Sequence, residues 1–284
     1  MAPLNKHLVS LRATISTADT PFLSDFIRLS GFDVLSDVLR QLVFQQMERG
    51  GLIEQNIVEV LKCLRVLVND NAGFSSALDR PALITSVAQA LFVPTPGLRC
   101  HAADLLAALC VLSPKEGHGL VLAALSDTRF KSGQLRFEAL IKSFDASHGS
   151  PNPGQGVTQT CPTDGIWEWR VSALGLLNAL VNTPGALELR CQLRAELYRR
   201  GLNYALSTLR IQSPPEVFVA QTNLYEEERA EGLAFAVKDL IRVVKGVEGA
   251  EEALRVLLHR LTMALEQQAD EYATTQTPCS QLMT

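Results

Sequence analysis

The residues best suited to catalysis or metal binding are scattered along this sequence. Its five histidines, at positions 7, 101, 118, 148 and 259, show no metal-ligand spacing. None of the six cysteines forms a Cys-x-x-Cys pair, and those at positions 63, 100, 110 and 191 fall inside apolar helical patterns. Such cysteines are typical of buried, reduced thiols. His101 follows Cys100 directly, but two neighbouring ligands do not complete a zinc site. We expect neither a metal nor a cofactor.

The sequence also lacks the short motifs of common enzyme active sites. It contains no GxSxG, no HExxH, no P-loop and no GxGxxG between a strand and a helix. The formal net charge is −4, from 26 basic and 30 acidic residues, which provides no general attraction for nucleic acid or anionic membranes. No signal-like apolar segment and no run of about 18 apolar residues is present. We expect a non-enzymatic, cytoplasmic protein.

Composition and periodicity predict an all-α protein. Leu and Ala are abundant, 47% of the residues are hydrophobic and only 6% are aromatic, which favours helix over strand. In nearly every segment apolar residues recur at i, i+3, i+4 and i+7, the spacing of an amphipathic helix. We predict helices over residues 4–16, 20–30, 32–48, 53–70, 72–79, 81–92, 97–112, 117–125, 133–144, 167–182, 186–200, 202–211, 223–246 and 249–271.

Three of these segments are copies of one pattern. "CLRVLVN" (63–69), "LLAALCV" (105–111) and "LLNALVN" (176–182) align without gaps. Leu64 and Leu106 occupy equivalent positions and lie 42 residues apart. This spacing falls within the period of about 40–47 residues that armadillo and HEAT repeats share.

The third copy is delayed by a stretch rich in Gly, Pro, Ser and Thr, which we expect to form a flexible loop insertion at 145–166. A second pattern, a short helix followed by Gly and a longer helix, occurs at 26–39 and again at 196–209. This three-helix rhythm is typical of armadillo repeats. The predicted fold is an all-α armadillo-repeat, right-handed solenoid, also called an α-α superhelix.

The repeat alignment predicts a binding groove. In a stacked helical array, one stripe of the last helix of each unit packs inward and the neighbouring stripe lines a concave surface. Asn178 interrupts an apolar run, where burying an amide without a partner is costly, so we place it on the open stripe. The alternative is that Asn178 bonds the adjacent repeat. A small, mostly apolar groove suits an amphipathic peptide helix. The predicted groove residues are Leu61, Arg65, Val68, Ala103, Ala107, Cys110, Leu174, Asn178 and Val181.

Two tryptophans, Trp167 and Trp169, follow the loop insertion. We expect one of them to complete the core of the following repeat. The alternative is that they anchor a partner, because exposed tryptophans often do so at interfaces.

The ordered set of segments resembles the regulatory N-terminal region of diaphanous-related formins. That region combines the GTPase-binding and FH3 segments and is also called the diaphanous inhibitory domain. The most specific matches are "CLRVLVNDNAGF" (63–74) and "LLNALVNTPGALELRCQLRAEL" (176–197), and the resemblance covers roughly residues 4–245. It implies an armadillo-repeat fold.

The resemblance also implies partners. The concave groove would bind the C-terminal autoregulatory helix of the formin, within one chain or in trans, and a GTP-loaded Rho-family GTPase would displace it. Asn69, Asp70 and Asn71 match the corner that touches the GTPase in this family. Actin would be reached only indirectly through a full-length formin, and the expected location is cytoplasmic and cytoskeleton-associated.

The expected organisation is an armadillo-repeat FH3-like domain at 1–246, a C-terminal helix at 247–272 and a frayed tail at 273–284. In the family a small helical GTPase-binding subdomain precedes the repeats, and little of it precedes Leu4. Because the sequence also has no proline tract and no actin-nucleating domain, we expect a fragment or a stand-alone regulatory piece. The alternative function is a generic armadillo/HEAT scaffold, such as a cargo adaptor, that holds a different peptide in the same groove.

Overall fold

A computed structural model describes residues 2–49, 53–132, 135–145, 165–244 and 255. Within these ranges the chain folds into thirteen α-helices and no β-strand, as the periodicity predicted. The predicted loop lies mainly, and the predicted helix at 249–271 almost entirely, outside the described residues. The helices are α1 (Ala2–Thr17), α2 (Thr20–Arg28), α3 (Gly31–Arg49), α4 (Glu54–Val68), α5 (Asn71–Leu78), α6 (Pro81–Ala90), α7 (Pro96–Leu112), α8 (Glu116–Ser132), α9 (Glu138–Lys142), α10 (Ile166–Asn182), α11 (Leu187–Arg199), α12 (Leu202–Arg210) and α13 (Glu216–Val244).

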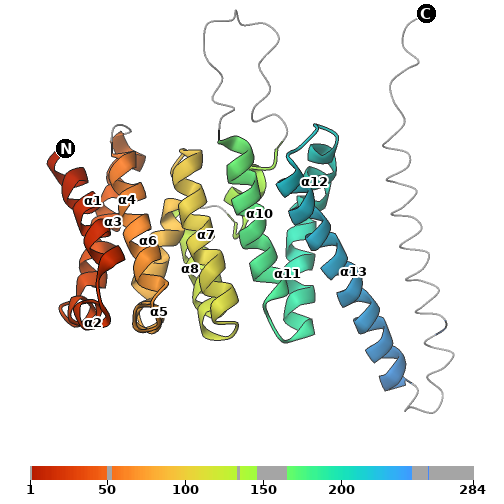
Figure 1. Cartoon of the computed structure of the whole chain (residues 1–284). Helices are drawn as coiled ribbons and strands as arrows, with labels where there is room; N and C mark the ends of the chain where they lie inside the picture. The colour runs from red at the N-terminus through yellow and green to blue at the C-terminus, as the bar shows by residue number, and fades with distance from the viewer. Residues whose placement is uncertain (1, 50–52, 133–134, 146–164, 245–254, 256–284) are drawn as a thin grey trace, which may run out of the picture. The chain divides into compact units, whose positions relative to one another are not determined.

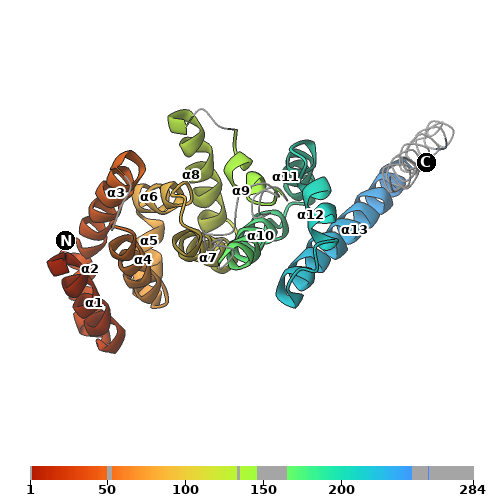
Figure 2. The ribbon, with the colours of Figure 1, turned by 90° about the horizontal axis from the view of Figure 1, so that it is seen from above.

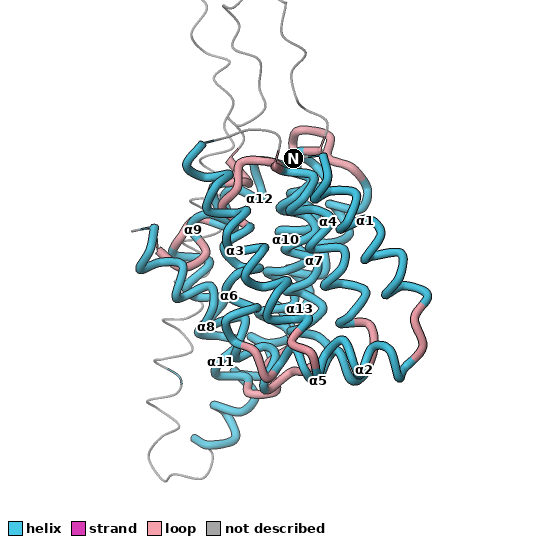
Figure 3. Tube along the Cα trace, turned by 90° about the vertical axis from the view of Figure 1, so that its left-hand side faces the viewer, coloured by secondary structure: helices cyan, strands magenta, loops and turns pink. Residues whose placement is uncertain are grey.

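The chain divides into two compact units, Met1–Arg229 and Ala230–Thr284, with the boundary inside α13. In the first unit the helices stack as an armadillo-like repeat (Figure 1). One layer is the row α1, α4, α7 and α10, in which each helix contacts the next. The row α3, α6 and α8 forms a second layer behind it, as Figures 2 and 3 show from two directions. The short helices α2 and α5 contact each other beside these layers.

The aligned leucines of the repeat form the core between the layers. Leu64, Leu106 and Leu177 are fully buried, and so are their partners one turn later in the same helices. Since a fully buried leucine contributes roughly 1.5–3 kcal/mol relative to an exposed one, these positions account for much of the packing energy of the unit. The alignment of the three copies is confirmed.

Two predicted Gly corners have different physical causes. Gly201, between α11 and α12, has φ +84°, a left-handed conformation that glycine adopts without strain. At the other corner Ser30 takes the positive φ of 62°, and Gly31 begins α3. A Cβ atom at Gly31 would lie 2.2 Å from the Phe26 ring, so glycine is needed there for space.

The helix α13 begins at Glu216, earlier than the predicted position 223. Pro214 and Pro215 precede it and stop the previous segment, and Phe218 is fully buried against Trp167, with ring centroids 5.3 Å apart. Trp169 is also buried, which confirms that a tryptophan completes the core. The Arg99 guanidinium stacks on its ring at 4.1 Å and thereby joins α7 to α10. None of the helices in the described ranges is long and apolar enough to cross a lipid bilayer.

Candidate partner-binding surface

Most of the predicted groove residues lie inside the protein. Only Arg65 is exposed and Ala107 half-buried, so the prediction that the other side chains line an open groove is wrong. The reason is that α4 and α7 each have a row neighbour on either side and a second layer behind them, while α10 packs against α7 and α11 and is hydrogen-bonded to α13. The open face is therefore narrower than the spacing suggested. The buried ones are Leu61, Val68, Ala103, Cys110, Leu174, Asn178 and Val181.

The face that is open to solvent is displaced by about one residue from the predicted one. Lys62 and Asp104 are accessible to solvent, whereas the predicted Leu61 and Ala103 are buried. Likewise Val111 is exposed and the predicted Cys110 is buried. We call this face the α4–α7–α10 stripe. It consists of Gln55, Val58, Lys62, Arg65 and Val66 on α4 with the C-cap residue Asn69, Gly97, Cys100, Asp104, Ala107, Ala108 and Val111 on α7, and Glu168, Val171, Gly175 and Asn182 on α10.

A signal for the correct register was present in the sequence. Lys62 and Asp104 occupy the same aligned position, and charged side chains at one position of two repeats indicate a solvent-facing column. Ala108 and Val111, which the sequence reasoning missed, follow on the same helical face because they lie four and seven residues after Asp104.

Asn178 is 4% exposed because α13 covers it. Its side-chain amide donates to the backbone oxygen of Gln221 at 3.0 Å and to the side-chain oxygen of Gln221 at 2.9 Å. The alternative interpretation of this residue, a bond to the adjacent helical unit, is therefore the one that the structure shows. The stripe accordingly narrows along α10.

The centre of the stripe is apolar. Ala107 and Ala108 are half-buried, Val111 is 59% exposed, and the neighbouring Leu112 is also exposed. Aliphatic side chains gathered on α7, the middle helix of the stripe, form a contact surface that water solvates poorly.

The α4 side of the stripe is charged. Glu59 accepts from Arg12 Nε at 2.8 Å and pairs with Lys62 Nζ at 3.0 Å, which links α1 to α4. Burial alone would raise the pKa of Glu59, but the hydrogen bonds and charges of Lys62 and Arg12 leave it below the usual 4.5. Burial lowers the pKa of His101, and the charges of Lys62 and Arg65 lower it further. The charges of Asp104 and Glu59 act in the opposite direction, so the seam between α4 and α7 carries charges of both signs.

The predicted GTPase corner lies at the end of α4. Asn69 and Asn71 are exposed, whereas the Asp70 carboxylate caps α5 by accepting from Ala72 N at 2.9 Å and Gly73 N at 3.1 Å. Of the three predicted residues, two have exposed side chains and the third fixes the corner. Gly73 holds the same corner, because a Cβ atom there would lie 1.9 Å from the Leu67 carbonyl oxygen.

The described residues contain no group of three His, Cys, Asp or Glu side chains that could hold a metal ion. Cys100 and His101 are half-buried neighbours on α7. His118 is buried, and its Nε2 atom lies 2.9 Å from the Leu180 backbone oxygen, a contact that ties α8 to α10. Cys191 is exposed on α11, so the prediction that it is buried is wrong.

Comparison with known families identifies two domains in this chain. Residues 2–111 match the Diaphanous GTPase-binding Domain, and residues 118–270 match the Diaphanous FH3 Domain. The first match contains the corner at Asn69–Asn71 and the stripe residues of α4 and α7, and the second contains those of α10.

Curated relatives show the same likeness. The chain is 25% identical over 240 residues to inverted formin-2 of Xenopus laevis, covering 84% of this chain and 20% of that protein. It is 24% identical over 228 residues to protein diaphanous homolog 3 of Mus musculus, covering 80% of this chain and 18% of that protein. It is 25% identical over 231 residues to formin-D of Dictyostelium discoideum, covering 80% of this chain and 17% of that protein. The chain thus spans about a fifth of the length of these relatives.

Both matched domains are regulatory binding modules without catalytic activity, as the absence of catalytic motifs predicted. The domain matches and the armadillo-like stack of helices indicate the same family, and the Asn-containing corner is consistent with it. The chain belongs to the diaphanous family of formin regulatory regions and carries its GTPase-binding and FH3 domains.

Proposed function

We propose that this chain regulates a formin-type actin assembly factor by holding the formin's C-terminal autoregulatory helix on the α4–α7–α10 stripe. Binding of a GTP-loaded Rho-family GTPase at the corner formed by Asn69, Asp70 and Asn71 releases that helix. The observation that carries the proposal is the exposed apolar centre of the stripe, where Val111 is 59% exposed beside Ala107 and Ala108. An amphipathic helix buries its own apolar face on such a surface.

The two binding surfaces share one residue. Asn69 is the C-cap of α4 and the first residue of the corner, and it also belongs to the stripe, one turn after Arg65. A helix that covers this end of the stripe therefore occupies part of the surface that the GTPase needs. Steric exclusion between the GTPase and the autoregulatory helix at Asn69 accounts for release of the helix. Actin and the cytoskeleton are reached only through the rest of the formin.

A fluorescence anisotropy titration of a labelled formin C-terminal helix tests the proposal. We expect Val111→Asp to weaken binding at least about tenfold, since each tenfold loss corresponds to about 1.4 kcal/mol and a carboxylate cannot enter an apolar contact without a larger loss. Val217→Asp on α13 is the matched control, because Val217 is equally exposed at 59% but lies outside the stripe. It should bind as the wild type does.

Addition of a GTP-loaded Rho-family GTPase should then release the labelled helix, while the GDP-loaded form should not. Equal affinity of Val111→Asp and wild type would refute the stripe as the binding surface. If no formin helix and no GTPase binds, the chain is instead a generic armadillo/HEAT scaffold that holds another peptide.

A further inference from the structure

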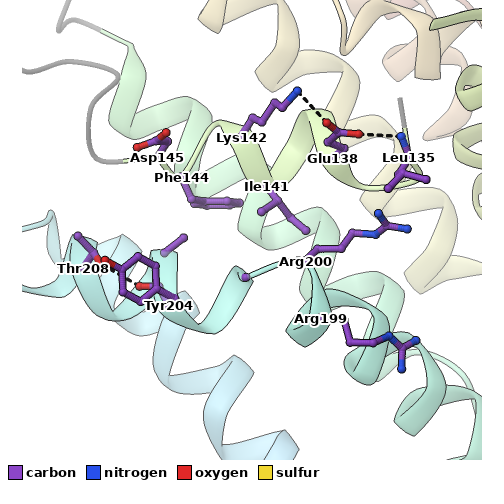
Figure 4. A pocket seen from close by; sticks show the side chains of 12 residues that line it. Leu135, Glu138, Ile141, Lys142, Phe144, Asp145, Arg199, Arg200, Tyr204 and Thr208 are labelled. Carbon is purple, nitrogen blue, oxygen red and sulfur yellow. Dashed lines mark hydrogen bonds and ion pairs between the residues drawn. The ribbon is translucent and has the colours of Figure 1, made fainter. Parts of the chain in front are cut away.

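A second surface lies away from the stripe. A cavity of about 640 Å³ opens where α9 faces the turn between α11 and α12, and none of its lining residues belongs to the α4–α7–α10 stripe (Figure 4). This volume is within the range of about 300–1,000 Å³ that is usual for ligand pockets. Neither the GTPase corner nor the proposed helix site uses it.

The cavity is lined by both apolar and charged side chains. Ile141 and the fully buried Phe144 come from the α9 side, and Ala205 comes from α12. At the rim Tyr204 is 71% exposed and Leu135 is 54% exposed, so two large side chains stand in water on opposite sides of the opening. Tyrosine is among the residues enriched at the energetic centres of protein interfaces. The Tyr204 hydroxyl makes no hydrogen bond with the residues that the structure describes.

The carboxylates that line the cavity already have cationic neighbours. Glu138 accepts from the Leu135 backbone N–H at 2.8 Å and pairs with Lys142 Nζ at 2.8 Å. These hydrogen bonds, that with Lys142 first, lower the pKa of Glu138. Asp145 lies beside Arg170, which donates to its backbone oxygen at 3.1 Å. Lys142 therefore offsets the negative charge of Glu138 toward an incoming anion, and the charge of Arg170 acts on Asp145.

One cationic side chain at the rim has no anionic partner among the described residues. Arg200 pairs with Glu196 at 3.0 Å, and Arg136 pairs with the same carboxylate. The exposed Arg199 guanidinium forms no ion pair and no side-chain hydrogen bond within the described ranges. A guanidinium binds a carboxylate through two parallel hydrogen bonds. The lining thus has three cationic side chains against two carboxylates in a chain whose net charge is −4.

We propose that this cavity docks an acidic peptide segment of a partner protein. One bulky apolar side chain of the peptide inserts between Phe144 and Tyr204, and a neighbouring Asp or Glu binds Arg199. A single available guanidinium next to two carboxylates suits one or two peptide carboxylates, whereas a nucleic acid would need several phosphate contacts. The partner would bind while the stripe remains free for the autoregulatory helix.

Selection of phage-displayed random dodecapeptides on the whole chain tests this proposal, with removal of peptides that also bind Ala205→Trp, in which the cavity is filled. We expect the enriched peptides to combine a bulky apolar residue with Asp or Glu. A synthetic copy of the strongest peptide should lose at least about tenfold in affinity on Arg199→Glu, where a charge-assisted pair becomes a repulsive one. Tyr204→Ala, at an exposed position, should also weaken binding and is a second variant that leaves the core intact.

The stripe variant Val111→Asp should bind the selected peptide as the wild type does, which separates this site from the proposed helix site. If the wild-type chain binds the selected peptide but not the formin helix, the proposed function is refuted and the cavity proposal stands. The cavity proposal is overturned if no peptide is enriched, if the enriched peptides lack acidic residues, or if they bind Arg199→Glu as tightly as wild type.

Discussion

The side-chain amide of Asn178 on α10 donates two hydrogen bonds to Gln221 on α13, at 3.0 and 2.9 Å. Asn178→Asp replaces the donor with a carboxylate that faces two acceptor oxygens in a buried site. We expect a loss of about 3 kcal/mol or more in the free energy of unfolding at pH 7. The new carboxyl has a raised pKa in the folded state, so the loss should shrink as the pH falls and the group becomes protonated. Urea denaturation at pH 7 and pH 5 measures both effects.

Asn182→Asp is the matched control on the same helix. The Asn182 side-chain oxygen accepts a hydrogen bond from the Arg194 guanidinium, so a carboxylate is favoured there. This variant should be as stable as wild type or more stable. Equal destabilisation of the two variants would show that the contact with Gln221 is not what decides the effect.

The Glu59 cluster predicts a dependence of stability on pH. Because Arg12 and Lys62 hold the pKa of Glu59 below 4.5 in the folded state, the ionised carboxylate stabilises the fold above that pH. The free energy of unfolding of wild type should exceed that of Glu59→Gln by about 1–3 kcal/mol at pH 7, and the difference should shrink as the pH falls below 4.5 and the carboxylate becomes protonated. Thermal or urea unfolding across this range measures it. Asp25→Asn, which removes an exposed pair with Arg28, should change stability by less than about 1 kcal/mol.

Two glycines predict opposite effects of the same substitution. Gly73→Ala places a Cβ atom 1.9 Å from the Leu67 carbonyl oxygen, and backbone cannot yield as a side-chain end can. We expect a loss of about 1–3 kcal/mol and weaker GTPase binding, since the corner must shift. Gly175→Ala, inside α10, meets no atom within 4 Å and should stabilise the chain by about 0.5–1 kcal/mol. Chemical denaturation measures the free energy of unfolding of both variants. An equal change in the two would contradict the packing described around these glycines.

The cysteines should react with N-ethylmaleimide at very different rates. Burial raises the pKa of Cys63 to about 11 and that of Cys110 to about 12, so few of these thiols ionise at pH 7. Cys191 is exposed on α11 and should be alkylated before Cys63 and Cys110. Peptide mapping by mass spectrometry of the native chain measures the order, and early labelling of Cys110 would show that the α7 core opens readily.

The helices and their repeat were readable from the sequence because the 3.6-residue period is a local property. The leucines at 64, 106 and 177 were correctly placed in the core for the same reason. The width of the open face was not readable, since it depends on how closely neighbouring helices approach. A shift of one residue turns a helical side chain by about 100°, enough to exchange Cys110 in the core with Val111 in solvent.

The pairing of Asn178 with Gln221 was likewise beyond the sequence, because it joins residues that lie 43 positions apart on different helices. The early start of α13 after Pro214 and Pro215 was missed because the apolar pattern between 216 and 222 is short. By contrast, the corner at Asn69–Asn71 was found through family likeness. The structure adds that the middle residue of the three caps α5.

The position of Asn69 at the junction of stripe and corner has a quantitative consequence for two ligands that both cover it. Each then raises the apparent dissociation constant of the other by the factor 1 + [L]/Kd, where L is the competitor, without any change in the backbone. Exchange would be graded by the concentrations of both ligands, and a tenfold tighter helix would require a tenfold higher GTPase concentration for half release.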